Sequence, residues 1–148
     1  GTEDDVIDYI EQCRKEFKSL PPAEVAFPRT VSNVEKWKSS SEMYLKGCPI
    51  HVRGAILYNH WTKKKEIDHK YASINNGEKI KFCYLKTPNW MHENVISFIQ
   101  DFPTELDLDK HIDYELQFNK SFLEPVKVIL DCIGWETERK NTLESFFS

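Results

Sequence analysis

The sequence predicts an α+β fold that is rich in helix and contains a small antiparallel sheet. Apolar residues recur at helical spacing near both ends of the chain, over residues 3–18 and 112–133. Between them, residues 79–85 alternate polar and apolar side chains and then become wholly apolar, which is typical of a strand. The 148 residues are 40% hydrophobic and 13% aromatic, enough to bury one core. We expect one domain over residues 1–134 and a flexible C-terminal tail over residues 135–148.

The first helix is expected over residues 3–18. Thr2 can cap it, and Asp4 and Asp5 lie in its first turn, where negative charge suits the helix dipole. Two prolines, Pro21 and Pro22, end it. Its buried face is predicted to hold Val6, Ile7, Ile10, Cys13 and Phe17. A short strand is expected next, around residues 25–27, before a polar turn.

A second helix is predicted to begin beside Cys48, in the segment KGCPIHVRGAILYNH of residues 46–60. Pro49 presets φ for a first helical turn, and its missing N–H is not needed there. Lys46, His51 and Arg53 crowd this helix N-terminus and could form an anion site, but physics alone slightly favours the alternative, an amphipathic helix with a solvated basic edge. The apolar positions Val52, Ala55, Ile56 and Leu57 can face a core. Gly54 costs about 1 kcal/mol in a helix, which suggests that another backbone approaches closely there.

The middle of the chain is expected to alternate turns and strands. The run of three lysines at residues 63–65 continues the helix into solvent, and Asn76 with Gly77 predicts a turn before the strand at residues 79–85. Residues 94–99 fit a strand and a short helix equally well.

The last third has the clearest helical pattern. Asp109 can cap a helix, Ser121 and Glu124 have the spacing of a capping box, and Pro125 must kink the helix or start a new one. We therefore predict two helices that meet near Ser121 and end at Gly134 in a left-handed cap. Their apolar stripe is expected to hold Ile112, Leu116, Phe122, Val126, Ile129, Leu130 and Ile133.

Charge is distributed unevenly along the chain. The net charge is −4, yet residues 36–65 carry seven basic side chains and one acidic one. A basic block inside an acidic chain indicates a localised polyanion-binding face, or a solvated face that meets the acidic segments. Within the block, Lys36, Trp37 and Lys38 place a ring between two positive charges, a combination that suits a sugar-phosphate backbone.

The four cysteines exclude two kinds of framework. Cys13, Cys48, Cys83 and Cys132 are scattered and form no C-x-x-C pair, which argues against a structural zinc site and a disulfide scaffold. We expect reduced, buried thiols in a cytoplasmic protein. No apolar run approaches the roughly 20 residues of a membrane span, so no membrane partner is expected.

Two segments carry a resemblance to a known family. The sequence IDYELQFNKSFLEPVKVILDCIGW, residues 112–135, resembles the thumb-domain segment of family B DNA polymerases. KGCPIHVRGAILYN, residues 46–59, resembles a thumb helix in replicative polymerases of tailed bacteriophages, and the likeness runs over most of the chain in the same order. The resemblance implies a thumb that grips the primer-template duplex through its backbone. By position it implies duplex contacts by Lys36, Trp37, Lys46, His51, Arg53 and Lys120.

The same resemblance places catalysis elsewhere. Polymerase chemistry needs carboxylates that hold two metal ions about 4 Å apart. The palm motifs that supply them in this family are missing here, and Asp107 with Asp109 reads better as a helix start. We therefore expect no catalytic residue and no cofactor in this chain, Mg²⁺ in a parent polymerase, and the palm and fingers domains of that parent as partners.

The tail is expected to bind a sliding clamp, as the resemblance implies. Leu143, Phe146 and Phe147 are spaced so that one helical turn puts them on a single side. The alternative is that they fold back or fray, as chain ends often do.

Two other functions compete with a polymerase thumb. One is a freestanding nucleic-acid-binding or adaptor protein, which we would expect to begin with Met, whereas this sequence begins with Gly1 as if cut from a longer chain. The other is a small hydrolase that uses Cys48 or a histidine, for which no nucleophile motif or Gly-rich loop is present.

Overall fold

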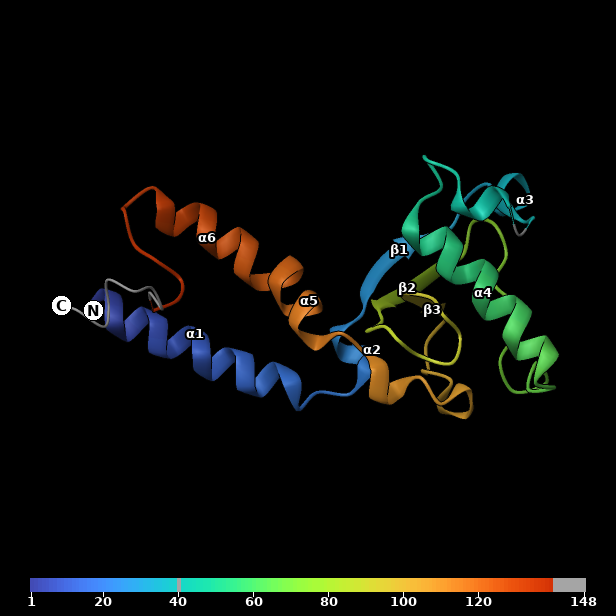
Figure 1. The fold of residues 1–148 in the computed structure, drawn as a ribbon, viewed down its shortest axis with the longest axis horizontal. Helices are drawn as coiled ribbons and strands as arrows, with labels where there is room; N and C mark the ends of the chain where they lie inside the picture. The colour runs from blue at the N-terminus through green and yellow to red at the C-terminus, as the bar shows by residue number, and fades with distance from the viewer. Residues whose placement is uncertain (40, 140–148) are drawn as a thin grey trace. The chain divides into compact units, whose positions relative to one another are not determined.

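The chain adopts an α+β fold with a three-stranded antiparallel sheet, as predicted (Figure 1). The computed structural model describes residues 1–39 and 41–139. These residues fall into two compact units. The first contains residues 1–20 and the chain from Phe118 onward, and the second is formed by residues 21–117.

The first unit opens with helix α1, Glu3–Lys18, which confirms the predicted helix. Thr2 caps it in a reciprocal capping box: the Thr2 hydroxyl accepts the Asp5 N–H at 3.2 Å, and the Asp5 carboxylate accepts the Thr2 N–H at 3.1 Å. The helix already ends at Lys18, where Ser19 donates its side-chain hydroxyl to the Glu16 carbonyl. The prolines at 21 and 22 therefore follow the helix end and do not cause it.

The predicted pair of helices at the C-terminal end is instead one helical run. Helix α5, Tyr114–Phe118, passes through a π-helical segment, Asn119–Leu123, into helix α6, Glu124–Asp131. No capping box forms at Ser121, because that residue lies inside the run. In an α-helix the Pro125 ring would meet the carbonyl four residues earlier, and a wider π turn at this place accommodates it.

The predicted start of this run was also wrong. Asp109 begins a short 3₁₀ turn, Asp109–His111, and not the helix. The first turn of α5 is capped by Asp113, whose carboxylate accepts the Leu116 N–H at 3.0 Å.

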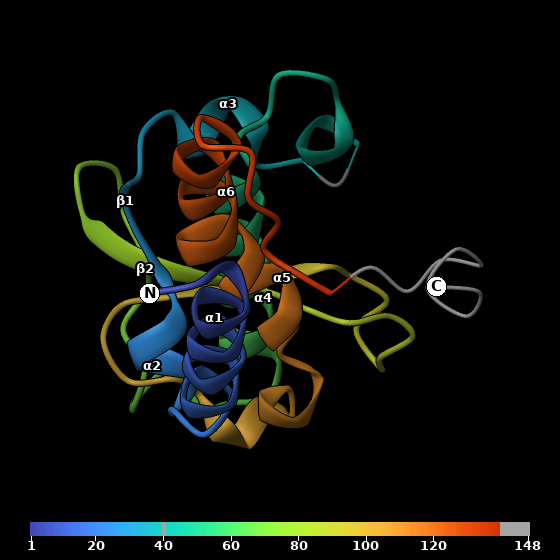
Figure 2. The ribbon, with the colours of Figure 1, turned by 90° about the vertical axis from the view of Figure 1, so that its left-hand side faces the viewer.

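The core of the first unit lies between α1 and α6, whose ribbons run side by side in both views (Figures 1 and 2). Its centre is Phe118, which contacts Phe17 edge-on with the ring centroids 5.3 Å apart and stacks on Phe122 at 5.1 Å. The buried members are Ile10, Phe118, Leu123 and Leu130. The predicted stripe is wrong at Ile129 and Ile133, which are exposed.

The left-handed end at Gly134 is confirmed. Its φ is +74°, and the next N–H, that of Trp135, bonds the Leu130 carbonyl at 3.0 Å. This 6→1 bond is the Schellman arrangement, which favours glycine at the left-handed position. It turns the chain back onto α1, where the Glu136 N–H bonds the Glu3 carboxylate at 2.9 Å.

The second unit is built on the sheet, in the order β1, β2, β3. Strand β1, Phe27–Thr30, begins later than predicted, because Val25 ends a short helix, α2 Pro22–Val25. Strand β2, Lys79–Tyr84, confirms the alternating segment, and the turn before it has Gly77 at φ +86°. Residues 94–99, for which strand and helix were equally expected, contain strand β3, Val95–Phe98.

Helix α4, Ile50–Lys64, packs on β3 and confirms both expectations for its interior. Its predicted apolar positions are all buried. Gly54 is the point of close approach: a Cβ added there would lie 2.9 Å from the Ser97 backbone nitrogen. This proximity lets the buried Ser97 hydroxyl donate to the His51 carbonyl at 2.8 Å. The shorter helical elements of the second unit are α3 Val34–Trp37 and the 3₁₀ turns Glu42–Tyr44 and Thr104–Leu106.

Candidate nucleic-acid interface

The Trp37 ring contacts one predicted cationic residue, Lys36, and the glycine that follows another, Lys46. Trp37 ends α3, and the Lys36 ammonium lies over its ring at 4.7 Å from the centroid. The same ring lies against Gly47, where an added Cβ would be 3.9 Å from its Cη2 atom. Gly47 has φ +102° and follows Lys46, so the ring holds the loop that carries this lysine. Lys36 and Lys46 are both exposed and hence accessible to a polyanion.

The beginning of α4 contains less positive charge than the sequence suggested. Pro49 is the N-cap residue and makes no side-chain cap, as a proline cannot. His51 shares a hydrogen bond of 3.1 Å between its Nε2 atom and the Thr30 carbonyl. Desolvation lowers the pKa of His51 below its usual 6.5, and nearby Arg29 lowers it further, although the bond to Thr30 opposes this. The imidazole is therefore neutral at pH 7, and its Nε2–H donates to Thr30.

Arg53 is bound inside the second unit. Its guanidinium lies 3.3 Å from the Glu93 carboxylate and donates to the Asn94 side-chain oxygen at 2.9 Å. Tyr44 donates its hydroxyl to the other oxygen of Glu93, and this bond raises the pKa of Tyr44 to about 12. Arg53 also lies under the Tyr44 ring, 5.7 Å from the centroid. A phosphate at this place would have to compete with the Glu93 carboxylate for the guanidinium.

The remaining predicted residues lie in the first unit or outside the described residues. Lys120 lies exposed in the π-helical segment of the first unit. The proposed clamp-binding side chains Leu143, Phe146 and Phe147 lie outside the described residues.

Sequence reasoning missed Arg29 as a surface cation. It is exposed on the edge strand β1, and its guanidinium lies 5.6 Å from the centroid of the Phe82 ring. The run FPRT offered no signal beyond a single basic residue in a β-prone segment. Arg29 lies near His51 because β1 pairs with β2 in the register that sets Phe27 opposite Phe82. That register cannot be read from the sequence.

The cysteines form no disulfide, and the expectation of burial holds only for part of them. Cys83 is buried, Cys132 is exposed and the other two are half-buried. Desolvation raises the pKa of Cys48, although nearby Arg53 opposes this, so its thiol is a poor nucleophile at neutral pH. Among residues 1–39 and 41–139, no three His, Cys, Asp or Glu side chains gather closely enough to hold a metal ion.

Comparison with known proteins adds a relation that geometry alone does not give. No protein-family model matches the chain. The chain is similar to a phage DNA polymerase. It is 26% identical over 149 residues to the DNA-directed DNA polymerase of Enterobacteria phage T4. The match covers 98% of this chain and 16% of that polymerase, so the chain spans about one sixth of its length. The similarity supports a polymerase-related chain.

In the part of the chain that the structure describes, no helix has both the length and the apolar character that crossing a membrane would require.

Proposed function

We propose that this chain is the thumb of a DNA-directed DNA polymerase of family B from a phage, and that it grips the primer-template duplex through its phosphates. The observation that carries the proposal is the similarity to the phage T4 polymerase over almost the whole chain. The exposed Lys36 and Lys46 supply the surface together with the half-buried Trp37, whose ring contacts the Lys36 ammonium and lies against Gly47, the residue after Lys46. Lys120 is the cation that the first unit would add.

The six predicted contact residues would not contribute equally. Arg53 and His51 are already bonded to Glu93 and Thr30, so each would reach a phosphate only after giving up that partner. Lys36 and Lys46 meet no such competition from a carboxylate in the described residues. We therefore expect these two lysines to account for most of the affinity.

The test is duplex binding by the 148-residue chain at several salt concentrations. With Lys36 and Lys46 each neutralising one phosphate, the slope of log K against log salt should be about −2, at ~0.9 per phosphate. Lys36→Gln and Lys46→Gln should each reduce the slope by about 0.9 and weaken all duplex sequences alike. Lys110→Gln, another exposed lysine, is the matched control and should change neither.

Two results would overturn this assignment. Equal slopes for Lys36→Gln, Lys46→Gln and Lys110→Gln would remove the proposed surface. A preference for one DNA sequence that disappears with Lys36→Gln would indicate base recognition in place of a backbone grip.

Catalysis and processivity belong, in this proposal, to groups beyond the described residues. The described carboxylates form no cluster that fits Mg²⁺, so no step of nucleotidyl transfer is assigned to them. The palm and fingers of a parent polymerase would supply that chemistry, and Leu143, Phe146 and Phe147 would anchor a sliding clamp. A synthetic peptide of residues 139–148 should bind the cognate clamp, and its variant with both phenylalanines changed to Ala should not.

The second candidate function is a freestanding nucleic-acid-binding or adaptor protein. It predicts the same salt-dependent binding but no preference for a primer-template junction or duplex over single strands. Equal affinity for single-stranded and duplex DNA of the same length would favour this reading over the thumb.

A further inference from the structure

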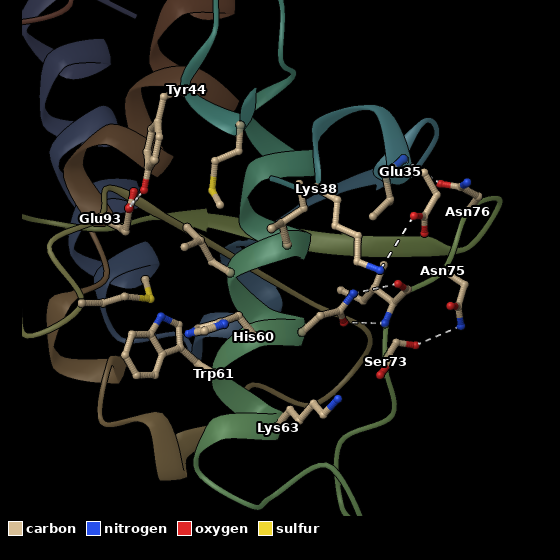
Figure 3. A pocket seen from close by; sticks show the side chains of 17 residues that line it. Glu35, Lys38, Tyr44, His60, Trp61, Lys63, Ser73, Asn75, Asn76 and Glu93 are labelled. Atoms are coloured by element: carbon tan, nitrogen blue, oxygen red, sulfur yellow. Dashed lines mark hydrogen bonds and ion pairs between the residues drawn. The ribbon is translucent and has the colours of Figure 1, made fainter. Parts of the chain in front are cut away.

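A cavity of about 870 Å³ lies along α4 in the second unit (Figure 3). Its volume falls within the range of about 300–1,000 Å³ that is usual for small-molecule sites. The wall is contributed by α3, the 3₁₀ turn Glu42–Tyr44, α4 and the segments around residues 73–76 and 91–93. No function described above uses this cavity.

The lining of the cavity is apolar at its base and aromatic on one side. Met43 and Met91 contribute flexible, polarizable thioethers, which adapt to the shape of a ligand. Trp61 is half-buried and is held edge-on by Trp90, with the ring centroids 4.8 Å apart. The remaining apolar lining residues are Val34, Ile56, Leu57 and Ile74. A ligand that fills the cavity must therefore bring an apolar or aromatic body.

The hydrogen-bond acceptors of the lining are largely occupied. The Asn59 side-chain oxygen accepts the Ile74 N–H at 2.8 Å, and the Asn76 side-chain oxygen accepts the Val34 N–H at 2.9 Å. The Glu93 carboxylate is bonded by Tyr44 and Arg53. Among the amide and carboxylate oxygens of the described lining, that of Asn75 stays open, so little acceptor capacity remains for a cationic or donor-rich ligand.

The groups that remain are mainly donors. Within residues 1–39 and 41–139, the Lys63 ammonium, the Ser73 hydroxyl and the amide nitrogen of Asn76 make no hydrogen bond or ion pair. These residues line the cavity together with His60, as Figure 3 shows. Lys38 and Glu35 form an ion pair of 3.8 Å between two largely exposed side chains, so their charges cancel at the rim. The ligand that best matches these donors is one that accepts hydrogen bonds and carries negative charge.

We propose that this cavity binds a small amphiphilic anion, whose apolar or aromatic body lies on Met43, Met91 and Trp61. Its carboxylate, sulfonate or phosphate group is bound by Lys63 and by a further donor of the lining, such as the Ser73 hydroxyl. The site shares neither Lys36 nor Lys46 with the DNA surface, and α3 contributes residues to both.

The test uses 8-anilinonaphthalene-1-sulfonate as the probe and the whole 148-residue chain. Its neutral counterpart, N-phenyl-1-naphthylamine, has the same rings without the sulfonate. Fluorescence titration should give one site for the sulfonate and an affinity at least about tenfold lower for the neutral probe, since ~1.4 kcal/mol corresponds to tenfold. Deoxyadenosine monophosphate should bind more weakly than the sulfonate, because its polar base does not match an apolar floor.

Two adjacent lysines provide the matched variants. Lys63 lines the cavity, whereas Lys64 is exposed on the same helix and does not. Lys63→Gln should weaken the sulfonate about three- to tenfold and leave the neutral probe unchanged, and Lys64→Gln should change neither. Both sites are exposed, so circular dichroism should show folded variants.

Several outcomes would overturn the proposal. These are equal affinity of the two probes, equal effects of Lys63→Gln and Lys64→Gln, or tighter binding of the mononucleotide. Loss of the sulfonate signal in Ile129→Ser, with Lys63→Gln unaffected, would place the probe on the exposed face of α6 and likewise refute the site.

Discussion

Helices α4 and α6 begin beside a proline and carry similar apolar patterns, yet they differ in how many of the apolar side chains are buried. On α4 every predicted apolar position is buried, because strand β3, helix α3 and the 3₁₀ turn Glu42–Tyr44 all pack on this helix. On α6 the positions that face α1 are buried, such as Leu130, whereas Val128, Ile129 and Ile133 remain exposed. Apolar periodicity therefore identifies the helix, and the neighbouring element decides how much of the stripe is core.

The largest expected difference between the two helices is the loss of stability when an isoleucine of each is truncated to alanine. Ile56 of α4 is 7% exposed and Ile129 of α6 is 67% exposed. Ile56→Ala should lower the free energy of unfolding by about 2–5 kcal/mol, since it removes buried methyl groups. Ile129→Ala should change it by less than about 0.5 kcal/mol. Urea denaturation of both variants checks this, and similar losses would contradict the comparison.

The next effect tests the contact that distinguishes α4. Gly54→Ala places a Cβ within 3 Å of the Ser97 backbone nitrogen, so helix and strand must separate. We expect a net loss of about 1–3 kcal/mol in the free energy of unfolding, despite the better helix propensity of alanine.

Gly134→Ala is the control for Gly54→Ala in the other unit. An added Cβ at Gly134 meets nothing within 4 Å, and only its φ of +74° opposes the substitution. The expected loss is about 1 kcal/mol. A stabilised Gly54→Ala variant in urea denaturation would refute close helix–strand packing.

A smaller effect is expected at Arg53. Its side chain is 19% exposed and that of Glu93 is 11% exposed. Arg53→Gln would leave the Glu93 carboxylate without its charged partner, at a cost of about 1–2 kcal/mol in the free energy of unfolding. The double variant with Glu93→Gln should recover part of that loss, because no charge is then left unpaired. Strictly additive losses in the double-mutant cycle would show that the two side chains do not interact.

The smallest expected effect is a pH dependence at His51. Desolvation holds its folded pKa below 6.5, so the unfolded chain binds a proton there before the folded chain does. The free energy of unfolding should therefore fall as pH decreases through 6.5, until the folded pKa is reached. His51→Gln keeps a donor for Thr30 and should show a flatter curve between pH 7.5 and 5. Identical curves would mean that His51 does not titrate differently on folding.

The sequence allowed prediction of features that depend on local chemistry. The Thr2 cap, the left-handed Gly134 and the turn at Gly77 all follow from side-chain size or from a nearby hydroxyl, and all three are present. The π-helical segment and the missing Ser121 cap depend on how the chain accommodates Pro125 over several turns, which local spacing does not reveal.

The candidate site was predictable only in outline. The basic character of residues 36–65 is a property of composition, but the pairing of Arg53 with Glu93 joins residues 40 positions apart. The association of Trp37 with Gly47 likewise depends on the loop conformation. The donor-rich character of the cavity depends on which side-chain amide oxygens accept hydrogen bonds from backbone N–H groups. None of these has a signature in residue spacing.

The order of the two units along the chain has a mechanical consequence. Residues 21–117 form a unit inserted between two segments of another, and those segments are fastened by bonds such as Glu136 to Glu3 and Arg139 to Asp8. A pulling force applied between residues 3 and 139 would act first on these polar bonds and on the core around Phe118. The inserted sheet unit would experience no force until the bonds and core of the first unit had broken. A pulling experiment on this chain should therefore record two separate extensions in a fixed order, with the smaller, discontinuous unit always giving way first.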